Sequence, residues 1–171
     1  MAYPKILILR LSAVGDVLRT LPAVMTLKEY FPSSHVAWMV EEPSKTLLES
    51  QPEIENVILL PRKRWTEGMK SIGKAWKTFK EVGQFILELR RQKFDVVLHF
   101  HGIIKSGMIS FLSGAPKRIG YDRKSSREGN FLFSNIQVKL PEERISRYRR
   151  NFALLKGLGL DVKDFEARLH I

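Results

Sequence analysis

Short, largely apolar runs recur along this chain at intervals that leave room for a helix between them. Residues 6–9 are Ile-Leu-Ile-Leu, and further runs occupy 35–40, 56–60 and 94–100. A strand without polar alternation is covered on both faces, which is typical of a parallel sheet, and parallel strands need crossover connections. The pattern therefore predicts an α/β domain of the Rossmann-like type, with helices on both faces of a parallel sheet.

Segments with the apolar spacing of helices lie between these runs. We expect helices over 22–30, 44–49, 103–112 and 142–158, with Pro22 in a first turn, and extended pieces at 118–121 and 136–140. The longest helix is expected from residue 76 to about 91. Its buried face should hold Trp76, Phe79, Val82, Phe85, Ile86 and Leu89. Its exposed face should hold Lys77, Lys80, Glu81 and Arg90.

Length and composition exclude several classes of protein. The 171 residues, 44% of them hydrophobic, suffice for one domain with a core. The chain has no cysteine, which excludes disulfides and thiolate chemistry, and its four histidines lack metal-ligand spacing, so we expect no metal and no other cofactor. The run at 6–9 is too short for a signal-peptide core, and no apolar stretch approaches a membrane span.

Positive charge is concentrated in the middle of the chain. Residues 60–127 hold 16 basic and 5 acidic side chains, whereas residues 1–59 hold 5 and 7 and residues 128–171 hold 8 and 6, for a net charge of +11. This excess predicts a partner with several negative charges: nucleic acid, an anionic membrane surface, or a phosphorylated or carboxylated substrate. A nucleic-acid module would need stacking aromatics among the cations, and only Trp65 and Tyr121 qualify.

Ligands of such sheets bind at the carboxyl ends of the strands, so the loops there hold the candidate site residues. After the first strand the chain continues Ser12-Ala-Val-Gly15-Asp16, which is neither the dinucleotide fingerprint nor a Walker P-loop. Gly15 would allow close backbone approach. Asp16 could cap the following helix, a role that Asp fills commonly, or act as a general base on a hydroxyl nucleophile. The local sequence leaves both interpretations open.

Cations gather in three further loops at the expected carboxyl edge. They are Arg62, Lys63 and Arg64 before Trp65, Lys105 in a helix first turn after Gly102, and Lys117, Arg118, Arg123, Lys124 and Arg127 around the fifth strand. Each group could be a solvated surface, or together they could form a basic rim for phosphates and carboxylates. His99 and His101 flank Phe100 where the strand ends, and we expect at most one of them to face the cleft.

The ordered set of motifs carries a family resemblance that covers nearly the whole chain. Residues 6–23, with Ser12-Ala-Val-Gly15-Asp16 and then Leu21-Pro22-Ala23, resemble the opening of the lipopolysaccharide heptosyltransferases, glycosyltransferase family 9. The similarity continues through 38–42, 62–65, 94–106 and 118–121. The glutamate pair at 41–42 and the cations before Trp65 are most similar to the members that add L-glycero-D-manno-heptose to the Kdo region of lipid A.

The resemblance implies an inverting transferase of the GT-B fold that uses ADP-heptose without an obligatory metal. Asp16 falls on the family's proposed catalytic base, which favours the base over the cap. The Kdo-lipid A acceptor is anionic and matches a basic rim, although Lys105 could instead reach the donor phosphates. The implied substrate-binding residues are Ser12, Gly15, Arg62, Lys63, Arg64, Lys105, Arg118, Arg123, Lys124 and Arg127.

The resemblance also sets an expectation for domain organisation. Family members carry two Rossmann-like domains, and the second supplies most contacts to ADP-heptose. Residues 1–171 are therefore expected to form a single acceptor-side domain, inactive alone, that works at the inner face of the cytoplasmic membrane of a Gram-negative bacterium. The alternatives are a related glycosyltransferase with another sugar or acceptor, and a basic nucleic-acid-binding module.

Overall fold

A computed structural model describes residues 4–11, 13–70, 72–126, 128–141 and 145–160. Six strands form one parallel sheet in the order β3-β2-β1-β4-β5-β6. They are β1 (Lys5–Leu9), β2 (His35–Val40), β3 (Asn56–Leu59), β4 (Val96–His99), β5 (Lys117–Tyr121) and β6 (Ile136–Val138). The predicted parallel α/β sheet is confirmed. Because the order reverses direction between β1 and β4, the sheet is doubly wound, with its switch point there.

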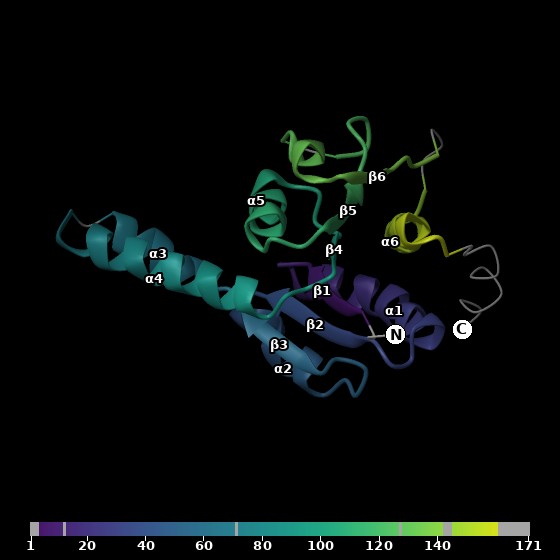
Figure 1. The fold of residues 1–171 in the computed structure, drawn as a ribbon, viewed down its shortest axis with the longest axis horizontal. Coiled ribbons are helices and arrows are strands. Elements are labelled where there is room, and N and C mark those ends of the chain that lie inside the picture. The colour runs from purple at the N-terminus through teal and green to yellow at the C-terminus, as the bar shows by residue number, and fades with distance from the viewer. Residues whose placement is uncertain (1–3, 12, 71, 127, 142–144, 161–171) are drawn as a thin grey trace.

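The apolar run of β1 is explained by cores on both faces of the sheet. Ile6 and Ile8 belong to a core shared with helices α1 (Val14–Tyr30) and α6 (Arg147–Leu154), whereas Leu7 and Leu9 belong to a core shared with α4 (Ile72–Arg91) and α5 (Ile104–Leu112). Figure 1 shows the sheet between these helices. Alternate side chains of a strand point to opposite faces, so a strand that is covered twice has no polar position.

Several element boundaries differ from the sequence predictions. Helix α1 begins at Val14, so Pro22 lies inside it and not in its first turn. The proline ring of Pro22 removes one backbone hydrogen-bond donor from the helix, but the burial of Val17 and Thr20 stabilises the helical turns before it. The final helix, expected over 142–158, is α6 followed by a 3-10 turn, and residues 142–144 lie outside the described residues. The remaining elements are η1 (Glu42–Ser44), α2 (Lys45–Glu49), α3 (Arg62–Met69), η2 (Asn130–Phe133) and η3 (Leu155–Leu158).

Helices α3 and α4 form a hairpin that extends well beyond the sheet (Figure 1). Residues 62–64 were expected in a loop but begin α3. Gly68 allows the close approach of the two helices, since a Cβ there would lie 2.1 Å from Thr78 Oγ1.

The inner face of α4 packs only along part of the helix. Phe85 and Leu89 reach the core, whereas Trp76 and Phe79 are 68% and 65% exposed. The prediction that these two aromatics are buried is wrong, because the sheet ends before it reaches their part of the helix. Glu81, expected on the exposed face, is half-buried and binds Arg64 at 2.7 Å.

His99, the last residue of β4, is fully buried as a core histidine, with its ring against Gly120 of the neighbouring strand β5. Its Nδ1 accepts a hydrogen bond from Asn130 Nδ2 at 3.0 Å, and its Nε2 lies 2.8 Å from Ser134 Oγ. Acceptance at Nδ1 leaves the ring proton on Nε2, which donates it to the serine. Both nitrogens of a neutral ring are thus used.

Gly120→Ala is expected to destabilise the protein by about 2 kcal/mol through this histidine. A Cβ at residue 120 would lie 2.2 Å from His99 Cε1 and 2.4 Å from Ser134 Oγ, so the ring must move and lose a bond. Urea denaturation measures the loss. Gly73→Ala in α4 is the matched control, because a Cβ there meets nothing within 4 Å and alanine favours a helix. Equal stability of Gly120→Ala and the parent would contradict the close packing.

Within the part of the chain that the structure describes, no helix is both long enough and apolar enough to span a bilayer.

Candidate active site

A hollow of about 480 Å³ opens at the switch point of the sheet. Its walls come from the segments that follow β1 and β4, from the start of α1 and from α6. The lining residues are Arg10, Asp16, Arg19, Phe100, His101, Ile103, Ile145, Arg147, Arg150 and Asn151. Doubly wound sheets bind their ligands in this crevice, so the hollow is the candidate site.

Asp16 lies in the first turn of α1 but does not cap the helix. Ala13 is the N-cap residue, and its carbonyl accepts the backbone N–H groups of Asp16 and Val17 at 2.9 and 3.0 Å. The capping interpretation is therefore wrong, since the helix begins two residues before Asp16. The carboxylate instead faces the hollow, where the free N–H groups of the helix start favour negative charge.

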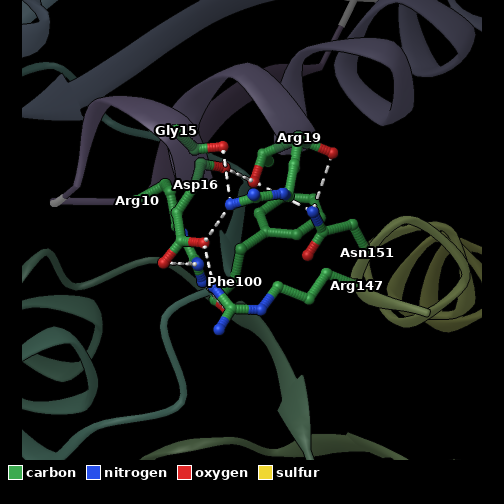
Figure 2. Close-up of polar contacts among 8 residues, drawn as sticks. Arg10, Gly15, Asp16, Arg19, Phe100, Arg147 and Asn151 are labelled. Carbon is green, nitrogen blue, oxygen red and sulfur yellow. Dashed lines mark hydrogen bonds and ion pairs between the residues drawn. The ribbon is translucent and has the colours of Figure 1, made fainter. Parts of the chain in front are cut away.

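Three arginines, from the segment after β1, from α1 and from α6, bind the carboxylate of Asp16 (Figure 2). Arg10 Nη2 lies 2.7 Å from Oδ2, Arg147 Nη1 lies 2.7 Å from Oδ1, and Arg19 Nη1 lies 3.3 Å from Oδ1. Arg10 follows β1 directly, and its side chain is 11% exposed. Its Nη1 also donates to Phe100 O at 2.7 Å, which ties the end of β1 to the end of β4.

These contacts fix the charge of the candidate base. Partial burial favours a higher pKa for Asp16, but the charge of Arg10 and the hydrogen bond from Arg147 outweigh it, so the pKa lies below its ordinary value of 3.8. Asp16 is therefore ionised at neutral pH. A carboxylate has about four acceptor positions. Among the described residues three guanidinium groups occupy three of them, which leaves one position on Oδ2 open to a hydroxyl.

Helix α6 is held in the register that places Arg147 opposite Asp16. Ser146 caps the helix, its Oγ accepting from Arg149 N at 3.2 Å. Asn151 Nδ2 donates to Arg19 O at 2.9 Å and to Thr20 Oγ1 at 3.1 Å, which joins α6 to α1 (Figure 2).

Arg10 and Arg147 were not among the site residues predicted from the sequence. Arg10 could have been predicted from one feature of the sequence, because it is a cation directly after an apolar strand, at the end of the sheet where ligands bind. Arg147 has no such feature, because it lies 131 residues from Asp16 along the chain.

Lys105 and Arg62 lie together, as predicted for a basic rim. They line a second hollow of about 480 Å³ between α3 and α5, whose other lining residues are Trp65, Thr66, Met69 and Lys70. Lys63 lines a smaller depression of about 330 Å³ that it shares with Arg62 and Glu41. Arg62 Nη1 is 2.9 Å from Glu41 Oε1, and Arg64 is turned to Glu81 of α4.

Arg118 does not lie on this rim, and that prediction is wrong. It is the second residue of β5, near the amino end, and its guanidinium donates to Ala115 O at 2.9 Å and Phe133 O at 3.0 Å. It therefore stabilises the opposite edge of the sheet.

The remaining predicted site residues have mixed placements. Arg123 and Lys124 do follow the carboxyl end of β5, and Arg123 lies over the Phe131 ring at 5.9 Å. Gly15 is exposed, and its carbonyl accepts from Arg19 at 3.2 Å. Ser12 and Arg127 lie outside the described residues.

His101 is the histidine that faces the main hollow. It is half-buried among the lining residues, while His99 is fully buried, so the expectation that at most one reaches the cleft is confirmed. Burial, and then the charge of Arg10, lower the pKa of His101, which keeps the ring neutral at pH 7. The described residues contain no group of three or more histidine or acidic side chains that could hold a metal ion.

A doubly wound parallel sheet with a charged crevice at its switch point defines the class: a Rossmann-like domain of the kind that makes up GT-B glycosyltransferases. The structure superposes on Escherichia coli heptosyltransferase WaaC with ADP-2-deoxy-2-fluoro heptose, with a TM-score of 0.80, 26% identity, and coverage of 92% of this chain and 49% of that one. Residues 82–171 match the model of glycosyltransferase family 9 (heptosyltransferase). The chain belongs to this family.

Individual relatives agree with that assignment. The lipopolysaccharide core heptosyltransferase OpsX of Haemophilus influenzae is 35% identical over 134 residues, which are 78% of this chain and 35% of that protein. Lipopolysaccharide heptosyltransferase 1 of Pseudomonas aeruginosa is 27% identical over 154 residues, which are 87% of this chain and 42% of that protein. The chain thus spans less than half the length of these two relatives.

Proposed function

We propose that this chain is the acceptor-side domain of a heptosyltransferase that moves heptose from ADP-heptose to the Kdo and inner-core region of lipopolysaccharide, with inversion. The observation that carries the proposal is Asp16, an ionised carboxylate with an open acceptor position at the switch point of a family 9 chain. The presence of ADP-2-deoxy-2-fluoro heptose in the related WaaC structure supports the donor class.

The proposed reaction is a single displacement. The acceptor hydroxyl oxygen attacks the anomeric carbon of the heptose while the bond from that carbon to the diphosphate oxygen breaks, and ADP leaves with the electron pair. The hydroxyl proton passes to Asp16, whose open position on Oδ2 accepts it. Arg10 holds the carboxylate toward the hollow and keeps it ionised, so Asp16 stays competent as a base down to mildly acidic pH.

The second hollow is the proposed place for the anionic groups of the acceptor. Kdo carries carboxylates and lipid A carries phosphates, and the forked guanidinium of Arg62 and the ammonium of Lys105 suit both. The ion pair with Glu41 limits the rotamers that the Arg62 side chain can adopt before an acceptor binds. Lys63, Arg64, Arg123 and Lys124, together with Ser12, Gly15 and Arg127, remain predicted contributors.

Arg62→Ala and Lys105→Ala are each expected to raise the KM for Kdo-lipid A about tenfold, with a smaller effect on kcat. Each substitution removes a cation that binds the acceptor before and during the reaction alike. Steady-state kinetics with varied acceptor measure the change. Lys117→Ala is the control, since Lys117 is an exposed cation at the amino end of β5. An unchanged KM in both Arg62→Ala and Lys105→Ala would remove the acceptor from this hollow.

The whole proposal is tested by transfer from ADP-heptose to Kdo-lipid A. We expect transfer by this domain when it is joined to a donor-binding half, none by the 171 residues alone, and activity at the inner face of the cytoplasmic membrane of a Gram-negative bacterium. Transfer from a different nucleotide sugar, with ADP-heptose inert, would overturn the donor assignment. Normal turnover by the 171 residues alone would overturn the division into two halves.

A further inference from the structure

Helix α4 has two apolar stripes, and the fold packs only one of them. Leu89, half-buried Phe85 and buried Thr78 face the sheet and α3. The outward stripe holds Trp76 and Phe79, whose rings stack at 6.3 Å with an interplanar angle of 13°. About two turns beyond Phe79 and three beyond Trp76, exposed Leu87 continues the same side of the helix. Large apolar side chains gathered on one exposed face mark an interaction surface.

The hairpin that carries this outward stripe is also strongly basic. Residues 62–80 carry seven basic side chains and one acidic side chain. Arg62 and Arg64 are engaged in ion pairs, but in the part of the chain that the structure describes Lys70, Lys74 and Lys77 are exposed and form none. Lys80 Nζ lies 5.3 Å from the centroid of the Trp76 ring. The same hairpin thus presents both exposed aromatic rings and exposed ammonium groups.

An anionic bilayer surface satisfies both kinds of group at once. Tryptophan is favoured at the level of the lipid headgroups, where its ring is apolar and its N–H is solvated. Lysine stems extend to the phosphates while their charges lower the binding free energy, by about 1 kcal/mol for each cation at an anionic surface. A purely apolar partner would offer the lysines no negative charge, and a nucleic acid would offer the outward Leu87 and Phe79 no apolar surface to pack against.

We propose that the α3–α4 hairpin docks on an anionic lipid bilayer, with Trp76 and Phe79 at the interface and Lys70, Lys74 and Lys77 on the headgroups. The hairpin leaves the sheet at the carboxyl end of β3 and extends past it (Figure 1). The same hairpin carries Arg62 and Trp65 of the second hollow. The second hollow is therefore built in part by the element that docks. The inference deepens the proposed function, on which it rests for the glycolipid nature of the acceptor.

Co-sedimentation of the chain with vesicles tests the proposal. Vesicles of phosphatidylcholine with about one-third phosphatidylglycerol should bind it, and phosphatidylcholine alone should bind it about tenfold or more weakly. Trp76→Ser combined with Phe79→Ser, and Lys74→Glu combined with Lys77→Glu, should each weaken binding about tenfold or more. The matched controls are Leu132→Ser, at another exposed apolar residue, and Lys139→Glu combined with Lys156→Glu, with the same change of net charge. Both controls should bind like the parent.

Tryptophan fluorescence reports which residue enters the interface. Trp38 is fully buried and Trp65 is half-buried, so a blue shift on vesicle addition should come from Trp76 and disappear in Trp76→Phe, which still binds. Absence of vesicle binding, or equal losses in the controls, overturns the proposal. The proposal is also overturned if the chain binds no vesicles but forms a dimer that the combined Trp76→Ser and Phe79→Ser substitutions abolish, because the stripe then binds a second copy of the chain. These vesicles contain neither Kdo-lipid A nor ADP-heptose, so failure here leaves heptose transfer standing, and failed transfer leaves the docking result standing.

Discussion

Asp16→Asn is expected to lower the kcat of heptose transfer by about 10²–10⁴-fold, the range that a general base contributes. The amide keeps the size of the carboxylate but cannot take the proton of the acceptor hydroxyl. The three arginines still surround residue 16, so the KM values for donor and acceptor should change much less than kcat. The measurement is steady-state transfer by this domain joined to a donor-binding half.

The control for this variant is Asp95→Asn. Asp95 Oδ2 accepts from Lys5 N at 2.7 Å at the amino edge of the sheet, so the substitution removes the same charge far from the hollow and should leave transfer unchanged. Asp16→Asn also leaves the buried guanidinium of Arg10 without an anionic partner, at a cost of about 2 kcal/mol that a folded domain tolerates. Near-normal transfer with a lowered unfolding midpoint would make Asp16 a purely structural residue.

The sheet was predictable because its central strands are covered on both faces. The run at 6–9 has no polar residue, and a strand can be apolar at every position only when a core lies on each of its faces. The start of α1 was not predictable by the same means. Ala13 is the N-cap without a capping side chain, and Pro22 gave a false start signal eight residues too late.

The sequence predicted a site residue correctly only where its local sequence context was enough to place it. Asp16 follows from its place after β1 and from the family motif. Its partner Arg147 depends on the packing of α6 against α1, which no local pattern encodes. Arg118 was misplaced because its side chain turns back along the amino end of β5 to backbone carbonyls. For Trp76 and Phe79, helical spacing identified a common face but not that the sheet ends before it reaches them.

Acidification from pH 6.5 to about 4 is expected to lower the free energy of unfolding by about 3 kcal/mol through His99 alone. Burial, and then the charge of Arg118, lower the pKa of His99 from 6.5 to about 4. Between these two pH values the histidine is protonated in the unfolded chain but neutral in the folded protein, so the free energy of unfolding falls as the pH falls. Urea denaturation at intervals from pH 7 to pH 4.5 measures the slope. Asp16 and Glu55 also have lowered pKa values, and their contributions to stability are lost as the pH falls from their ordinary values of 3.8 and 4.5, so they add to the loss only at the acidic end of this range.

His99→Gln should flatten most of this slope, because the amide can still hydrogen-bond to Asn130 and Ser134 but takes no proton. Some slope should persist, since the pKa of His101 is lowered as well and acts in the same direction. His35→Gln, at the partly exposed start of β2, is the matched control and should retain the slope of the parent. If His99→Gln keeps the full slope, the proton that destabilises the fold binds elsewhere, and the network of His99, Asn130 and Ser134 does not hold a neutral ring.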